Sequence, residues 1–134
     1  MELQPGGRLG YALAGNAVVT LEGKTSRFTY RIEASKKPGS KVTHWVYVLN
    51  GPNNETDHRF IGGITSLGFY RSNKSPISAG APSVKAFAWW MRHIDDSQVR
   101  VYHSGSCGRC GRTLTTPESV RTGIGPTCAA RRQA

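Results

Sequence analysis

The sequence predicts an α+β fold in which a small antiparallel sheet carries one packed helix and is followed by a cysteine-containing module. Three observations support this prediction. Several segments between residues 17 and 71 alternate apolar and polar side chains or concentrate β-branched and aromatic ones. One later stretch repeats its apolar residues at helical spacing, and every cysteine lies after residue 106. We therefore expect a β-rich domain over residues 1–98 and a separate module over residues 99–134.

The strands are expected where these patterns are strongest. Residues 27–33 alternate strictly, with Phe28, Tyr30 and Ile32 on one face and a polar, mostly basic set on the other. Residues 42–49 are the most apolar stretch and should form a central strand. Residues 1–15 are interpreted as a tail whose apolar segment, residues 9–13, can join a sheet edge. The complete set of predicted extended segments is 17–21, 27–33, 42–49, 58–65, 67–71 and 99–102.

The predicted helix covers about residues 82–94. Ser83 can cap its start, and Val84, Phe87, Met91 and Ile94 recur at the spacing of one helical face. A second, single-turn helix is expected after Thr115 and Thr116, because proline and glutamate follow them, and it should end at Gly123.

The three cysteines indicate a metal site. An odd number of cysteines argues against a disulfide framework. Cys107 and Cys110 form a Cys-x₂-Cys pair, and 17 residues separate Cys110 from Cys128. This spacing is typical of zinc fingers. A turn with two cysteines, a connecting segment and a third cysteine before a terminal helix together predict a treble-clef-like finger holding one structural Zn²⁺.

A tetrahedral zinc site requires a fourth ligand. We expect His103, because Gly105 lets the chain turn back toward the cysteines. The alternatives are Glu118, water, or a histidine from the first domain (His44, His58 or His93). Three thiolates would weaken the Lewis acidity of the ion, and the nearby sequence offers only one carboxylate, so we expect no enzyme activity.

The net charge of +10 is confined to two segments. Residues 24–41 and residues 100–134 each have a net charge of +5, and the rest of the chain sums to zero. Clustered basic residues suit DNA, RNA or a nucleoprotein complex as partner, whereas solvated charge without a partner is the simpler alternative. The residues expected to make these contacts are Lys36, Lys37, Lys41, Arg109, Arg112, Arg121, Arg131 and Arg132.

The stretch Cys-Gly-Arg-Cys-Gly-Arg, followed by Leu-Thr-x-Pro-Glu-Ser and Gly-Ile-Gly-Pro-x-Cys, resembles a poorly characterised family of small zinc fingers from bacteria and phages. The resemblance covers residues 103–128. It implies a zinc-binding fold, a histidine ligand ahead of the first cysteine and a phage-related origin, but no reaction. The small size of the chain and its basic charge also suit a second function, a phage-encoded inhibitor of the anti-CRISPR type that docks on a host defence complex.

The expected location is the cytoplasm. The N-terminus lacks the basic and apolar regions of a signal peptide. No run of apolar residues is long enough to cross a membrane, so we expect no membrane partner.

Overall fold

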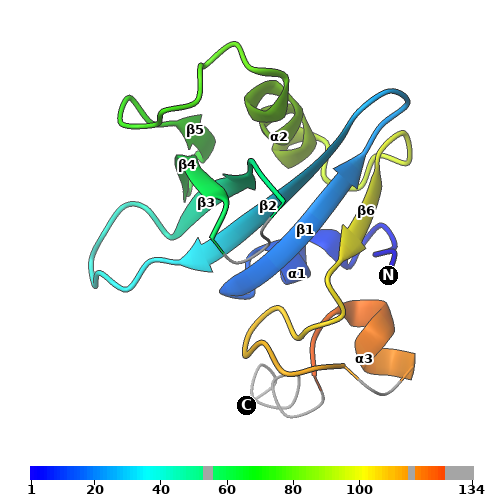
Figure 1. Ribbon diagram of the computed structural model, residues 1–134. Helices are drawn as coiled ribbons and strands as arrows, with labels where there is room; N and C mark the ends of the chain where they lie inside the picture. The colour runs from blue at the N-terminus through cyan, green and yellow to red at the C-terminus, as the bar shows by residue number, and fades with distance from the viewer. Residues whose placement is uncertain (53–55, 115–116, 126–134) are drawn as a thin grey trace.

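The computed structural model describes residues 1–52, 56–114 and 117–125, and it has an α+β fold built on an open, six-stranded antiparallel sheet (Figure 1). The strand order is β5-β4-β3-β2-β1-β6. The strands are β1 (Asn16–Glu22), β2 (Arg27–Ala34), β3 (His44–Leu49), β4 (His58–Thr65), β5 (Gly68–Arg71) and β6 (Arg100–His103). All six lie within two residues of the predicted extended segments.

The sheet buries one face. Along β1 and β2, Val19, Tyr30 and Ile32 are fully buried, whereas the residues between them remain partly accessible. The register places Val19 opposite Tyr30, and Tyr30 opposite Val48, so the buried side chains of neighbouring strands meet in one layer. This layer is the centre of the core.

Helix α2 (Pro82–Arg92) covers the buried face. The Phe87 ring lies 4.8 Å from that of Tyr30 and 4.9 Å from that of Phe69, and the Tyr30 hydroxyl donates to the Ser83 carbonyl at 2.6 Å. The expected cap was wrong. Ala81 occupies the N-cap position and Pro82 begins the helix, which places Ser83 inside its first turn.

The N-terminal segment differs from the prediction. Residues Arg8–Ala12 form a short helix, α1, rather than an edge strand. The edge contact is made instead by residues 1–3, which pair with β6: the Leu3 amide donates to the Val101 carbonyl at 2.6 Å, and the His103 amide donates to the Met1 carbonyl at 2.9 Å.

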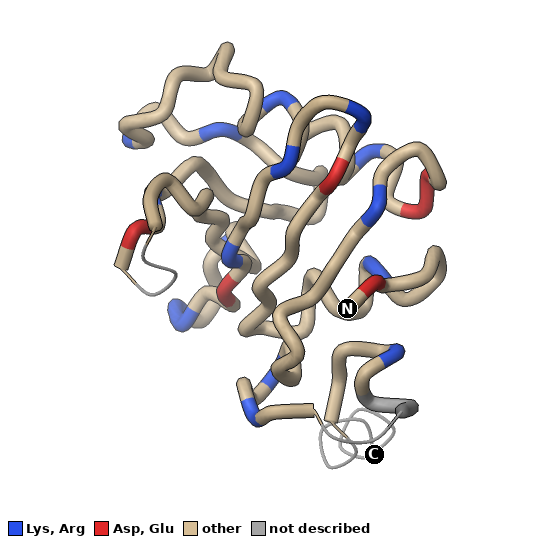
Figure 2. Tube along the Cα trace, turned by 45° about the vertical axis from the view of Figure 1, so that its right-hand side comes forward, with Lys and Arg blue, Asp and Glu red and all other residues tan. Residues whose placement is uncertain are grey.

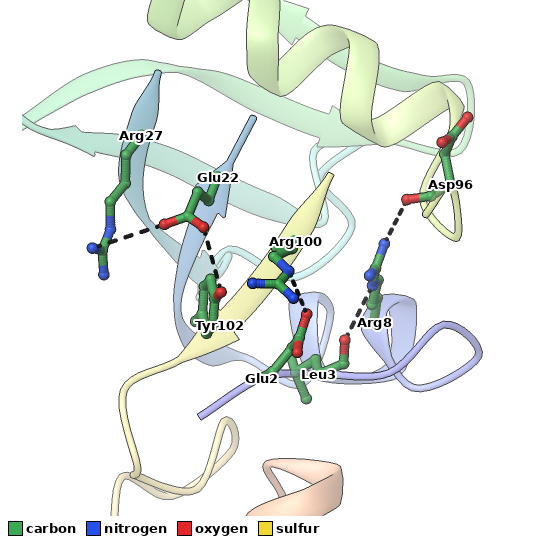
Figure 3. A network of polar contacts seen from close by, with 8 residues as sticks. All are labelled: Glu2, Leu3, Arg8, Glu22, Arg27, Asp96, Arg100 and Tyr102. Carbon is green, nitrogen blue, oxygen red and sulfur yellow. Dashed lines mark hydrogen bonds and ion pairs between the residues drawn. The ribbon is translucent and has the colours of Figure 1, made fainter. Parts of the chain in front are cut away.

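Arg8 holds this segment in place (Figure 3). Its buried guanidinium donates to the carbonyls of Leu3, Ile94 and Asp96, which ties the N-terminus to the end of α2. A buried cation with three carbonyl acceptors explains why the segment turns inward here rather than continuing along the sheet edge.

The C-terminal module begins inside the sheet. Strand β6 lies beyond the proposed boundary at residue 99 and pairs with β1, with Leu21 opposite Val101. Helix α3 (Pro117–Thr122) follows the loop that leaves β6, in the place expected for the single-turn helix. Within the described ranges, no helix is long and apolar enough to span a membrane.

Candidate metal centre

The two described cysteines lie on a tight hairpin that follows β6. Ser106 pairs with Thr113, and the Cys107 amide donates to the Arg112 carbonyl at 2.8 Å. The turn closes when the Gly111 amide donates back to the Cys107 carbonyl at 2.9 Å. Gly111 has φ of 81°, a conformation that favours glycine and that lets the chain reverse directly after Cys110.

The hairpin surrounds the Cys107 sulfur with donors. Its Sγ accepts hydrogen bonds from the Gly125 amide at 3.2 Å and the Arg109 amide at 3.4 Å, and the Cys110 thiol also hydrogen bonds to it. Burial by itself raises the pKa of the Cys107 thiol, but these hydrogen bonds outweigh it and lower the pKa to about 7. The thiolate, which is the form that binds metals, is therefore readily available at this position.

Cys107 and Cys110 differ in access. Cys107 is buried and Cys110 is exposed. One cysteine of the pair is therefore enclosed by the protein, and the other faces solvent. Cys128, the third predicted ligand, lies outside the described residues.

Tyr11 supports the hairpin from α1, a contact that was not predicted from the sequence. Its buried ring packs so closely against two glycines that a Cβ at Gly108 would lie 2.6 Å from the ring, and one at Gly123 would lie 2.5 Å from it. The Gly108 amide donates to the Gly123 carbonyl at 2.7 Å, which joins the hairpin to the chain after α3. In the sequence, Gly108 and Gly123 lie on either side of the connecting segment, and glycine at such positions is typical of a close approach between chain segments.

His103 lies beside the hairpin, but its ring is directed at the main chain. It is 4% exposed; Nε2 donates to the Val120 carbonyl, and Nδ1 accepts from the Gly105 amide at 2.9 Å. Burial lowers the pKa of His103, although the hydrogen bond to Val120 opposes this shift. The imidazole is thus held neutral, which a metal ligand needs, but coordination would require one ring nitrogen to exchange its hydrogen bond.

Cys107 and Cys110 share one turn, whereas His103 is hydrogen bonded to the main chain through both ring nitrogens. Among the described residues, no group of three or more histidines, cysteines or carboxylates is placed to hold a metal. Two of the three alternative histidines make contacts in the first domain: His44 Nε2 donates to the Leu13 carbonyl, and His93 stacks on Trp89. His103 is the histidine that lies nearest to Cys107 and Cys110 in the sequence.

The predicted contact residues occupy two regions of the molecule. Arg109 and Arg112 are exposed on the hairpin and Arg121 is exposed in α3, whereas Lys36, Lys37 and Lys41 are exposed in the loop between β2 and β3. Figure 2 shows basic positions along the strands of the sheet as well as in the C-terminal module. Arg131 and Arg132 lie outside the described residues.

A comparison with known protein families matches residues 100–133 to a family of unknown function (DUF6011). No curated protein and no solved structure matches the chain. The family match begins with β6 and includes the whole cysteine hairpin, so the poorly characterised unit expected from the sequence includes a strand of the sheet.

Proposed function

We propose that this protein is a small, phage-related, zinc-binding protein of the cytoplasm that binds nucleic acid through arginine and lysine clusters. The observation that carries the proposal is the Cys107 hairpin, which places a sulfur that accepts two main-chain hydrogen bonds on the same turn as two exposed arginines, Arg109 and Arg112. Residues 99–134 form the treble-clef-like unit in this proposal.

In this unit Cys107, Cys110, Cys128 and His103 hold one structural zinc ion. A bound ion would neutralise the thiolates and cross-link the hairpin to the C-terminal segment. The exposed arginines then stand on a rigid turn, where their planar guanidinium groups can bind phosphate oxygens in pairs.

Metal analysis of the purified protein tests the zinc site. We expect about one zinc ion per chain, and marked destabilisation when a chelator removes it. Cys107→Ser should abolish stoichiometric zinc and His103→Ala should weaken its retention, whereas His93→Ala, a histidine exposed on the first domain, should retain it. A metal-free wild-type protein with an unchanged unfolding temperature contradicts the proposal.

A salt series tests nucleic-acid binding. Phosphate neutralisation predicts that affinity falls steeply between about 50 mM and about 200 mM salt. The double variant Arg109→Gln/Arg112→Gln should bind more weakly and reduce the slope of log affinity against log salt by roughly two. The double variant Lys85→Gln/Arg92→Gln, at exposed positions of α2, removes the same number of charges and should change affinity much less.

An inhibitor that docks on a host protein gives a different result. Capture from host lysate would then survive nuclease treatment, and purified nucleic acid would bind equally weakly at every salt concentration. That pair of results replaces the proposed nucleic-acid partner with a protein.

A further inference from the structure

The sheet face opposite α1 and α2 is lined by half-exposed side chains. In β1 to β3, residues that alternate with the buried core positions remain partly accessible. The strand register places them in rows across the sheet. One row runs from Val18 through Arg31 and Tyr47 to Phe60, and another runs from Tyr102 through Thr20 to Thr29.

Aromatic rings are concentrated on this face. The Phe60 ring lies 5.7 Å from that of Trp45 and 5.8 Å from that of Tyr47, so the three form a cluster over β3 and β4. At the other end of the sheet, the Arg27 guanidinium lies 6.0 Å from the centre of the Tyr102 ring. Figure 3 shows Glu22 in contact with both Arg27 and Tyr102. None of Trp45, Tyr47, Phe60 and Tyr102 is fully buried.

Positive charge lies among and beside these rings. The Arg27 side chain is 67% exposed, although it contacts Glu22. Arg31 is paired with Tyr47 in the register and contacts Glu33; its side chain is 30% exposed, and its Nε is buried without a hydrogen-bond partner among the described residues. Lys36 and Lys37 line a shallow groove together with Trp45, which continues the face into the loop between β2 and β3.

We propose that this open face, consisting of Arg27, Arg31, Trp45, Tyr47, Phe60 and Tyr102 with Lys36 and Lys37 at its margin, binds single-stranded nucleic acid. The proposal rests on the proposed function and adds to it the binding surface and the form of the nucleic acid. Exposed rings stack on unpaired bases, and neighbouring arginines and lysines neutralise the backbone. A duplex keeps its base faces inside the stack, so the rings would gain nothing from it.

Fluorescence anisotropy with a labelled oligothymidine of about 12 nucleotides tests the proposal, with a duplex of equal length for comparison. The wild-type protein should bind the single strand roughly tenfold more tightly than the duplex. Tyr47→Leu and Trp45→Leu should each weaken single-strand binding about tenfold. Tyr47→Phe and Trp45→Phe preserve a ring and should retain most of the affinity, which separates stacking from loss of folding.

A matched pair of charge-removing variants tests the basic residues of this face. Arg31→Gln should weaken binding, whereas Arg92→Gln at the end of α2 should leave it within about twofold, because Arg92 lies on the helix that covers the opposite face. Equal affinity for single strand and duplex, together with leucine variants that bind like wild type, would overturn this inference and leave the proposed function standing. Absence of any nucleic-acid binding at low salt would overturn both.

Discussion

Tyr30 has a buried hydroxyl at the centre of the sheet. Because of this burial, the free energy of unfolding should vary with pH in the alkaline range. Burial raises the pKa of Tyr30 well above its ordinary value of 10. Below pH 10 the residue is protonated in both the folded and the unfolded state. Above it the unfolded chain releases the proton first, so the free energy of unfolding falls as pH rises.

Tyr30→Phe tests this dependence. The variant should lose about 1 kcal/mol at neutral pH, because the Ser83 carbonyl loses its donor. It should also lose less stability than wild type above about pH 10. Urea unfolding at neutral and alkaline pH measures both effects, and parallel curves for the two proteins would contradict the assignment.

Gly108 limits how the hairpin can pack against α1. Gly108→Ala would place a methyl group 2.6 Å from the nearest atom of the Tyr11 ring, and it should destabilise the protein by roughly 1–3 kcal/mol through overpacking. Gly80→Ala is the matched control, because its added carbon would meet only the Ser78 hydroxyl at 3.8 Å. Thermal unfolding of the two variants should separate them clearly. An unchanged Gly108→Ala midpoint would show that Tyr11 does not support the hairpin.

At the residue scale, the sequence predicted ligand types better than their orientation. Cysteine spacing drew attention to Cys107 and Cys110, and the structure places both on one turn. The cysteine spacing did not indicate that both His103 nitrogens would hydrogen bond to the main chain. Such bonds depend on where the fold places Val120 and Gly105. The aromatic surface was also missed: Trp45 and Tyr47 alternate with buried Val46 and Val48, but their stretch was predicted only as a central strand.

At the scale of the secondary-structure elements, Phe87 connects α2 to the sheet. It is fully buried and contacts rings from two strands. Phe87→Ala should therefore cost about 3–5 kcal/mol, whereas Trp89→Ala on the exposed side of the same helix should cost much less. Denaturant titration with near-UV circular dichroism distinguishes them. Similar losses would mean that α2 does not pack through this face.

Element prediction succeeded for the six strands and for α2, and it failed for α1. Residues 27–33 alternate strictly, β-branched residues mark β1, and helical spacing over three turns defines α2. Helix α1 has five residues, too few to show a period, and the buried Arg8 contacts that hold it are distant in sequence. The position of β6 beside β1 likewise depends on contacts between distant residues.

At the scale of the whole molecule, the structure suggests that the sheet and the C-terminal hairpin unfold together. Strand β6 belongs to the sheet, and Tyr11 contacts the hairpin from the N-terminal side. Scanning calorimetry should give one transition whose calorimetric and van't Hoff enthalpies agree. Two resolved transitions would instead support independent units divided near residue 99.

Leu3 tests the same coupling. It is fully buried in the segment that pairs with β6. Leu3→Ala should therefore lower the free energy of unfolding by about 2–5 kcal/mol and shift the single transition to lower temperature. Leu67→Ala makes the same chemical change at a side chain that is 98% exposed, and it should leave the transition unchanged. Equal effects of the two substitutions would show that the N-terminal segment is not part of the folded unit.

The pairing of residues 1–3 with β6 also bears on self-association. An exposed outer strand presents unpaired backbone groups to which another molecule can add. Here residues 1–3 of the same chain pair with the outer strand β6. The outer strand on the other edge of the sheet, β5, is only four residues long. Loosening the first three residues would therefore turn a self-contained sheet into a template for polymer growth at high protein concentration.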